Sequence, residues 1–311
     1  MQTLEKLEKF AQQGRIAFRE DAVAPVAILV APGGSAEVSL YGANVLSYRP
    51  TGHSPVLWLA DSYRVVEPGS PTRGGIPVCW PWFGRLENKD MPMHGFARTQ
   101  FWSVIEAESD AETTSVTLAL VENKSTLALW PHPFRLELKV TVGQSLALAL
   151  TTVNTGSAPF AITEALHTYF RVKEVSDTLV TGLDGQPYLD KTRDFAEFLQ
   201  SGAVSFPEAT DRVYYRHSGA AVITDPGIGR RIAIEKKGSG ASVVWNPNSE
   251  SCKRIGDMNP DDWRRFICVE TANAGGAPLE IAPGATHTIS ATISAILTDA
   301  DGRPVGVTAR A

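Results

Sequence analysis

Residues 134–154 read FRLELKVTVGQSLALALTTVN, and apolar and polar side chains alternate along most of this stretch. Successive side chains of a β-strand point to opposite faces of its sheet, so the alternation predicts strands with one buried and one exposed face. Gly143 and Asn154 punctuate the two runs. This stretch therefore favours an antiparallel sheet.

Similar short runs recur along the chain, separated by Gly, Pro, Asn or Asp. They are VAPVAILVA (23–31), AEVSLYGANVLSYRP (36–50), PVLWLA (55–60), TTSVTLAL (113–120), VITDPG (222–227), RRIAIEKKG (230–238), ASVVWNPN (241–248), FICVETAN (266–273) and TISATISAIL (288–297). No strand–helix–strand rhythm appears, which disfavours a parallel doubly wound sheet. We expect an all-β fold in which one large antiparallel sandwich spans residues 1–311. A curved sheet would leave a concave face for a site.

Helical periodicity is confined to two segments. Leu4, Leu7 and Phe10 fall on one helical face, and Gly14 is a suitable stop, which predicts an N-terminal helix over residues 1–14. The second predicted helix covers KTRDFAEFLQ, residues 191–200.

Composition limits the possible partners. The 311 residues are 43% hydrophobic and carry a formal net charge of -5, which disfavours binding to nucleic acid or an anionic membrane surface. A few local arginines would still accommodate a small anionic substrate. The three cysteines lack metal-site or disulfide spacing, and neither a signal core nor ~18 consecutive apolar residues occurs. A cytoplasmic location and a monomer are expected.

Two stretches place arginine in a setting suited to a sugar or a phosphate. In PTRGGIPVCWPWFGR (71–85), Arg73 precedes two glycines that permit close backbone approach, and tryptophans follow. The alternative is a structural loop with Arg73 in an ion pair. In MHGFARTQFW (93–102), His94 and Arg98 share a face if the segment is extended. The alternative is that both are solvated surface residues.

Three further stretches supply titratable groups. ITEALHTYF (162–170) places His167 on the face opposite Glu164, and a hydrogen-bonded core histidine is the alternative to a catalyst. Glu270 lies at the end of an apolar run in RRFICVETAN (264–273); it is either employed in a site or exposed beyond the strand. TDRVY (210–214) offers Asp211 in a loop, where it is otherwise a turn residue. Whether Trp245 and His132 belong to the site stays open.

Patterns for metal or cofactor chemistry do not occur. HExxH, CxxC, GxGxxG, GxxxxGK[ST] and GxSxG are all missing. The remaining inventory of a carboxylate, imidazoles and arginines favours cofactor-free general acid–base chemistry.

The motifs RGGIPVCWPWFG, HGFAR, EALHTYF, TDRVY, VVWNP and ICVETAN, taken in this order, resemble the aldose 1-epimerase (galactose mutarotase-like) superfamily. The branch that the chain resembles most is that of the D-hexose-6-phosphate mutarotases, over about residues 20–300. The resemblance implies a β-supersandwich with a concave active face, a few short helices, and cofactor-free interconversion of α and β anomers.

The same resemblance implies roles for individual residues. His167 matches the catalytic histidine and Glu270 the catalytic glutamate. Arg73 and Arg98 match two arginines that hold the sugar phosphate. The remaining matched positions contact sugar hydroxyls or the ring, and they are His94 and Asp211. Met93 stands where a substrate-binding glutamine is common in this branch, which leaves the identity of the preferred sugar open.

The resemblance leads to a mechanism as an expectation. Glu270 removes the O1 proton, and His167, kept protonated by the carboxylate beside it, protonates the ring oxygen O5. The alternatives are a mutarotase for neutral aldoses, a non-catalytic sugar-phosphate-binding module and a regulator that senses a sugar phosphate. The preferred hexose phosphate stays open.

Overall fold

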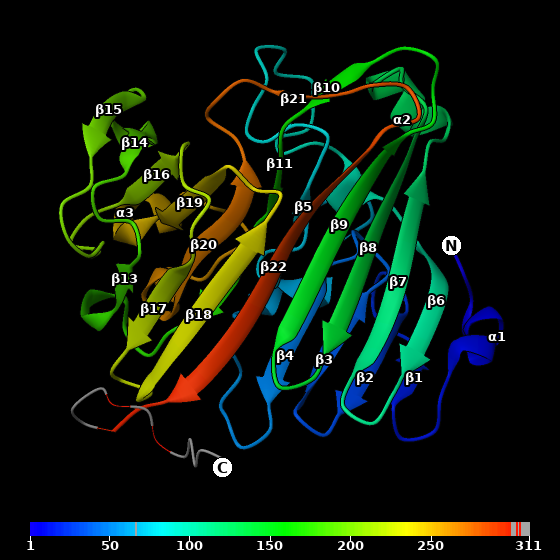
Figure 1. Cartoon of the computed structure of the whole chain (residues 1–311), viewed down its shortest axis with the longest axis horizontal. Coiled ribbons are helices and arrows are strands. Elements are labelled where there is room, and N and C mark those ends of the chain that lie inside the picture. Colours follow the sequence, from blue (N-terminus) through cyan, green and yellow to red (C-terminus); the bar gives the residue numbers. More distant parts are fainter. Residues whose placement is uncertain (66, 300–302, 304, 306–311) are drawn as a thin grey trace.

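The computed structural model describes residues 1–65, 67–299, 303 and 305. Nearly all regular structure is β, and within these residues every pairing between named strands is antiparallel. Figure 1 shows a large front sheet whose strands run diagonally across the molecule, with one sheet behind it and further strands at its left. The expected all-β sandwich with few short helices is confirmed.

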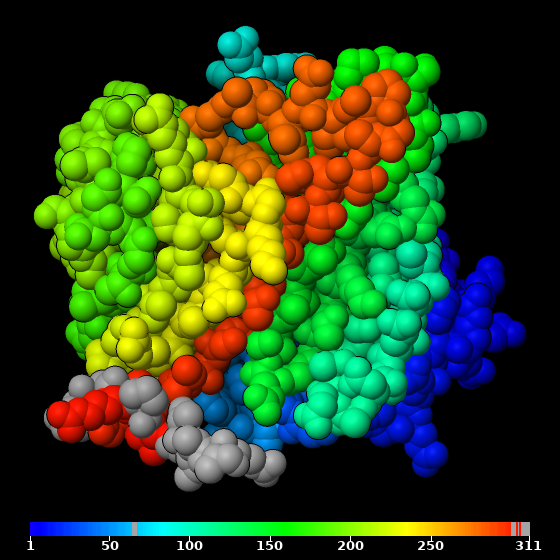
Figure 2. Space-filling view, viewed as in Figure 1, coloured from blue at the N-terminus to red at the C-terminus, as the bar shows by residue number. Residues whose placement is uncertain are grey.

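The front sheet has eight strands in the order β13-β17-β18-β22-β9-β8-β7-β6. Residues 134–154 supply β8 and β9 at its centre, as their alternation predicts, and each shows strict alternation of buried and half-buried residues. In Figure 2 the strands β18, β22, β9, β8 and β7 run side by side across the outer face. The strands are β6 (Ser103–Ser109), β7 (Thr114–Val121), β8 (Phe134–Val142), β9 (Leu146–Asn154), β13 (Leu179–Thr181), β17 (Ala221–Asp225), β18 (Arg230–Lys237) and β22 (Thr286–Leu297).

A second eight-stranded sheet, the site sheet, has the path β15-β14-β16-β19-β20-β11-β5, and β12 also pairs with β20. Its strands are β5 (Val78–Cys79), β11 (Glu164–Leu166), β12 (Tyr169–Arg171), β14 (Pro187–Asp190), β15 (Ala196–Leu199), β16 (Thr210–Tyr214), β19 (Ala241–Asn246) and β20 (Phe266–Asn273). A four-stranded sheet and a two-stranded sheet complete the fold. They contain β1 (Ile16–Arg19), β2 (Val26–Ala31), β3 (Gly34–Ser39) and β4 (Val45–Pro50), and β10 (Phe160–Ile162) with β21 (Leu279–Ile281).

One hydrophobic cluster contains buried residues from Leu7 to Ile293 and so joins the sheets. Two smaller buried clusters include residues of β20 and β19. The helices are short: α1 (Leu4–Leu7), α2 (Lys124–Leu129), α3 (Asn248–Cys252), and the 3-10 turns η1 (Glu8–Phe10), η2 (Asp61–Val65), η3 (Ala97–Thr99), η4 (Val175–Asp177), η5 (Lys191–Arg193) and η6 (Asp262–Arg265). None of the helices in the described part of the chain is long and apolar enough to span a bilayer.

Three sequence predictions were wrong in detail. The N-terminal helix ends at Phe10 rather than Gly14, because Ala11 is extended and Gln12 bridges to Ile16. Residues 55–60 form isolated bridges and no strand. Residues 191–200 form η5 and then β15, because the left-handed backbone at Asp194 and the next residue turns the chain into a hairpin with β14.

Candidate active site

The strand β20 places Glu270 on the face of the site sheet that points away from the main core. Ile267 and Val269 belong to the main hydrophobic cluster, whereas Phe266 and Cys268 belong to a separate one. Side chains alternate along a strand, so Glu270 shares the face of Cys268. Glu270 lies within the strand and is only 2% exposed, so the alternative of an exposed residue beyond the strand end is wrong.

His167 reaches the same face from the break between β11 and β12. The expected single strand over 162–170 is in fact three short ones, and the backbone N–H of His167 donates to the carbonyl of Pro77 in the neighbouring segment. The imidazole Nε2 lies 3.4 Å from Oε1 of Glu270. The ring stacks on Tyr169, with centroids 4.8 Å apart. Packing thus brings together two residues that are far apart in sequence.

A cavity of about 90 Å³ surrounds this pair. It is lined by Arg73, Phe83, Met93, His94, His167, Lys191, Asp211, Val243, Trp245 and Glu270. Five of the six predicted site residues line it, and Arg98 does not. Among the described residues, no group of three or more His, Cys, Asp or Glu side chains is arranged to hold a metal ion.

Burial dominates the protonation of the pair. It lowers the pKa of His167 well below the ordinary value, and the charges of Arg98 and Arg73 add to the effect. Burial likewise raises the pKa of Glu270 well above the ordinary value. The expectation that the carboxylate holds the His167 pKa high was therefore wrong, since desolvation disfavours both charged forms.

Arg73 enters the cavity already paired. Its Nε donates to both carboxylate oxygens of Asp257, at 3.1 and 3.2 Å, and its Nη1 donates to the hydroxyl of Tyr169 at 3.0 Å. The ion pair that sequence reasoning kept as an alternative thus exists inside the site. The glycines after Arg73 are needed for close approach, because a Cβ on Gly75 would lie 2.4 Å from the Val45 carbonyl oxygen.

His94 occupies the cavity wall. Its backbone has a φ of 64°, and η3 follows it, so the predicted extended face shared with Arg98 was wrong. Nδ1 of His94 accepts from the backbone N–H of Gly84 at 3.1 Å, which puts the ring proton of the neutral tautomer on Nε2. Burial, followed by the charge of Arg98, lowers the His94 pKa well below its usual value. Nη2 of Arg98 donates to the carbonyl of Met93 at 2.6 Å.

Asp211 lies in β16, between β14 and β19, rather than in the loop that the sequence indicated. Its Oδ2 pairs with Nζ of Lys191 at 3.0 Å. Burial raises the pKa of Asp211, and Lys191 opposes that shift. Sequence reasoning missed Lys191 as a site residue because it assigned residues 191–200 to a helix. Lys191 follows β14 directly, and the pairing of β14 with β16 brings it next to Asp211.

The remaining candidates separate clearly. Trp245 lines the cavity, with its ring 6.0 Å from that of His167. His132 packs on Trp130, with centroids 4.5 Å apart, and is not part of the cavity lining. Glu164 is fully buried and lies 3.0 Å from Nε2 of His287, apart from the cavity lining.

The arrangement places a buried imidazole and a buried carboxylate side by side in a small cavity of an antiparallel β-sandwich. Residues 26–294 match the sequence model of the aldose 1-epimerase family, and the chain belongs to this family. It is therefore an epimerase, an isomerase that acts on a small carbohydrate substrate.

Curated relatives carry a more particular name. A protein of Escherichia coli K12 described as "putative glucose-6-phosphate 1-epimerase" is 38% identical over 244 residues, which cover 78% of this chain and 81% of that one. A protein of Cenchrus ciliaris with the same description is 34% identical over 259 residues, or 80% and 78% of the two chains. The crystal structure of a "putative mutarotase (YeaD)" from Salmonella typhimurium superposes with a TM-score of 0.86 at 31% identity, covering 95% of this chain and 99% of that one.

Proposed function

We propose that this epimerase interconverts the α and β anomers of hexose 6-phosphates, with glucose 6-phosphate as substrate. The observation that carries the proposal is the buried contact of 3.4 Å between Nε2 of His167 and Oε1 of Glu270, in a cavity that Arg73 also enters. The names of the curated relatives agree with this substrate.

Ring opening needs one proton removed from O1 and one delivered to O5. The Glu270 carboxylate takes the O1 proton, while the His167 imidazolium protonates O5 and the C1–O5 bond breaks. Rotation about C1–C2 presents the other face of the aldehyde, and closure reverses both proton transfers. A pair that holds one proton supplies an acid and a base together, and each transfer contributes about 100- to 10,000-fold.

Substrate binding accounts for the location of that proton. The cations Arg98 and Arg73 are the main charges that lower the His167 pKa, whereas of these two only Arg98 lowers the Glu270 pKa, after the larger effects of Lys191 and Asp211. A phosphate dianion bound to both arginines offsets those charges, so the proton affinity of His167 rises more than that of Glu270. The phosphate thus moves the shared proton toward the imidazole.

Other residues of the site hold the substrate. Arg73 binds the phosphate from the cavity wall, as charge-assisted hydrogen bonds favour, and Arg98 is the second phosphate contact, from its position against the carbonyl of the cavity residue Met93. The hydroxyl groups and the ring contact His94, whose Nε2–H is the available donor, and Asp211. The ring of Trp245 offers an apolar wall for the C–H face of the sugar.

A mutarotase for neutral aldoses is the second candidate, and one observation favours it. Arg73 is already neutralised by Asp257, whose carboxylate would repel a phosphate. A phosphate therefore has to compete with Asp257 for this guanidinium, whereas a free sugar does not.

Two-dimensional NMR exchange spectroscopy distinguishes the candidates. Anomer exchange is measured for glucose 6-phosphate, glucose and galactose, with and without the protein. Cross-peaks that grow with protein for the phosphate alone support the hexose-phosphate activity. Faster exchange for the free sugars alone transfers the proposal to neutral aldoses, and no acceleration for any substrate rejects both.

A further inference from the structure

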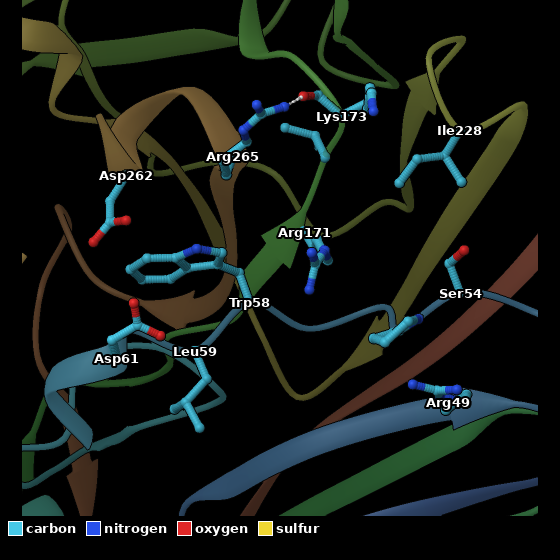
Figure 3. A pocket seen from close by; sticks show the side chains of 12 residues that line it. Arg49, Ser54, Trp58, Leu59, Asp61, Arg171, Lys173, Ile228, Asp262 and Arg265 are labelled. Atoms are coloured by element: carbon cyan, nitrogen blue, oxygen red, sulfur yellow. Dashed lines mark hydrogen bonds between the residues drawn. The ribbon is translucent and has the colours of Figure 1, made fainter. Parts of the chain in front are cut away.

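A second, larger cleft lies apart from the catalytic cavity. It has a volume of about 780 Å³ and shares no lining residue with that cavity. Figure 3 shows cationic side chains on one side, acidic side chains on the other and the Trp58 ring between them. The charged residues are Arg49, Arg171, Lys173 and Arg265 opposite Asp61 and Asp262.

The cationic side is not neutralised by the protein. Within the described residues, none of these four cations lies within salt-bridge distance of a carboxylate. Arg49, Arg171, Lys173 and Arg265 are all solvent-exposed. Several unpaired positive charges on one wall repel one another, which stabilises a bound anion relative to an empty cleft.

A buried arginine fixes the shape of the cationic wall. Arg230 is 1% exposed, and its Nη1 donates to the carbonyls of Ser54 and Pro55, at 3.3 and 2.9 Å. Its Nη2 donates to the carbonyl of Arg171. Arg230 therefore ties the 54–55 segment to β12, and both segments line the cleft. Its charge lies behind the wall and is only loosely balanced by Asp225, at 3.8 Å.

We propose that this cleft binds the phosphate group of a small phosphorylated metabolite, as a site separate from the catalytic cavity. The guanidinium groups of Arg49 and Arg171 present planar donors that match phosphate oxygens. Both side chains line the cleft, Arg49 from β4 and Arg171 from β12 (Figure 3). Carboxylates at the opposite end, on Asp61 and Asp262, accept hydrogen bonds from hydroxyl groups of the same ligand and repel a long polyanion.

Packed aromatic rings connect Trp58, which lines the cleft, to His167 of the catalytic pair. The Trp58 ring stacks on Tyr169, with centroids 5.9 Å apart, and Tyr169 in turn stacks on His167. A ligand in the cleft is thus separated from His167 by two packed rings. Binding itself does not depend on the proposed catalytic activity.

Isothermal titration of inorganic phosphate into the full chain tests the proposal. The background carries Arg73→Gln, which weakens the phosphate contact proposed for the catalytic cavity. Arg49→Gln and Arg171→Gln are compared with Arg231→Gln, an exposed arginine on β18 that points to the opposite face from Arg230. Thermal unfolding of each variant verifies that it is folded.

The expected result is saturable binding that weakens at least about tenfold in each cleft variant and stays unchanged in the control. An equal loss in all three variants would indicate general surface charge and would reject the site. Unchanged affinity in the two cleft variants, or no saturable binding in the background protein, would also reject it. Tighter binding of a short DNA duplex than of phosphate would overturn the assignment to a small ligand.

Discussion

Nε2 of His167 and Oε1 of Glu270 lie 3.4 Å apart on a face of the site sheet that the main core does not fill. Burying a carboxylate and an imidazole without further partners is unfavourable. Nδ1 of His167 and Oε2 of Glu270 are buried without a hydrogen-bond partner among the described residues. In the proposed mechanism the O1 hydroxyl of the sugar donates to the carboxylate, and the ring oxygen accepts from the imidazole.

Removal of either member of this pair should nearly abolish catalysis. We expect His167→Ala and Glu270→Gln each to lower kcat about 100- to 10,000-fold, because each removes one proton transfer. NMR exchange rates give kcat, and circular dichroism verifies the fold. His132→Gln is the matched control, since His132 lies outside the cavity lining, and its rate should be unchanged. A near-normal rate in either active-site variant contradicts the assignment.

Arg73→Gln tests the phosphate contact. We expect KM for glucose 6-phosphate to rise about tenfold or more, with a much smaller change for free glucose, because the lost interaction is with the phosphate. The measurement is the initial rate of anomerisation for both sugars, with Arg231→Gln as the control. Equal effects on the two sugars would mean that Arg73 has no preference for phosphate and acts through Asp257 and Tyr169 on the shape of the site.

The pair of His287 and Glu164 should make stability depend on pH. The hydrogen bond to Glu164 raises the pKa of His287 in the folded protein. A group with a raised folded pKa stabilises the fold fully below its unfolded pKa of about 6.5, and this stabilisation disappears as pH rises through the folded value.

We expect His287→Gln to cost about 1–3 kcal/mol near pH 6, since it leaves the buried Glu164 with fewer partners, and to cost less at higher pH. Urea unfolding of both proteins, from about pH 6 to about pH 9, measures the difference in their free energies of unfolding; this range extends from the ordinary histidine pKa upward. A difference that grows with pH would contradict the role given to His287.

Gly95 should tolerate no side chain. Its φ is 70°, and a Cβ would lie 2.0 Å from the carbonyl oxygen of Trp80. Gly14 is a matched control, because its φ is 71° but its surroundings are open. We expect Gly14→Ala to cost about 1–2 kcal/mol for the left-handed backbone alone. Gly95→Ala should cost about 1–3 kcal/mol more, from overpacking. Equal losses in urea unfolding would show that the backbone beside His94 yields easily.

Much of the fold follows from local patterns. Residues 134–154 become the strands β8 and β9 because a period of two residues matches the alternating faces of a half-buried sheet. The patterns failed where local preference was overridden by tertiary pairing. The helical periodicity of residues 191–200 gave way to a hairpin, since β14 offered its hydrogen-bonding edge to β15.

The sequence by itself determined the strand-rich class and the residue types available for acid–base chemistry, because periodicity and side-chain chemistry are local properties. Only the tertiary structure decided that Lys191 pairs with Asp211 and that Arg73 pairs with Asp257, 184 residues away. It also decided the direction of the His167 and Glu270 pKa shifts. Strand register and burial set those distances and the local desolvation, and both arise from packing of segments distant in sequence.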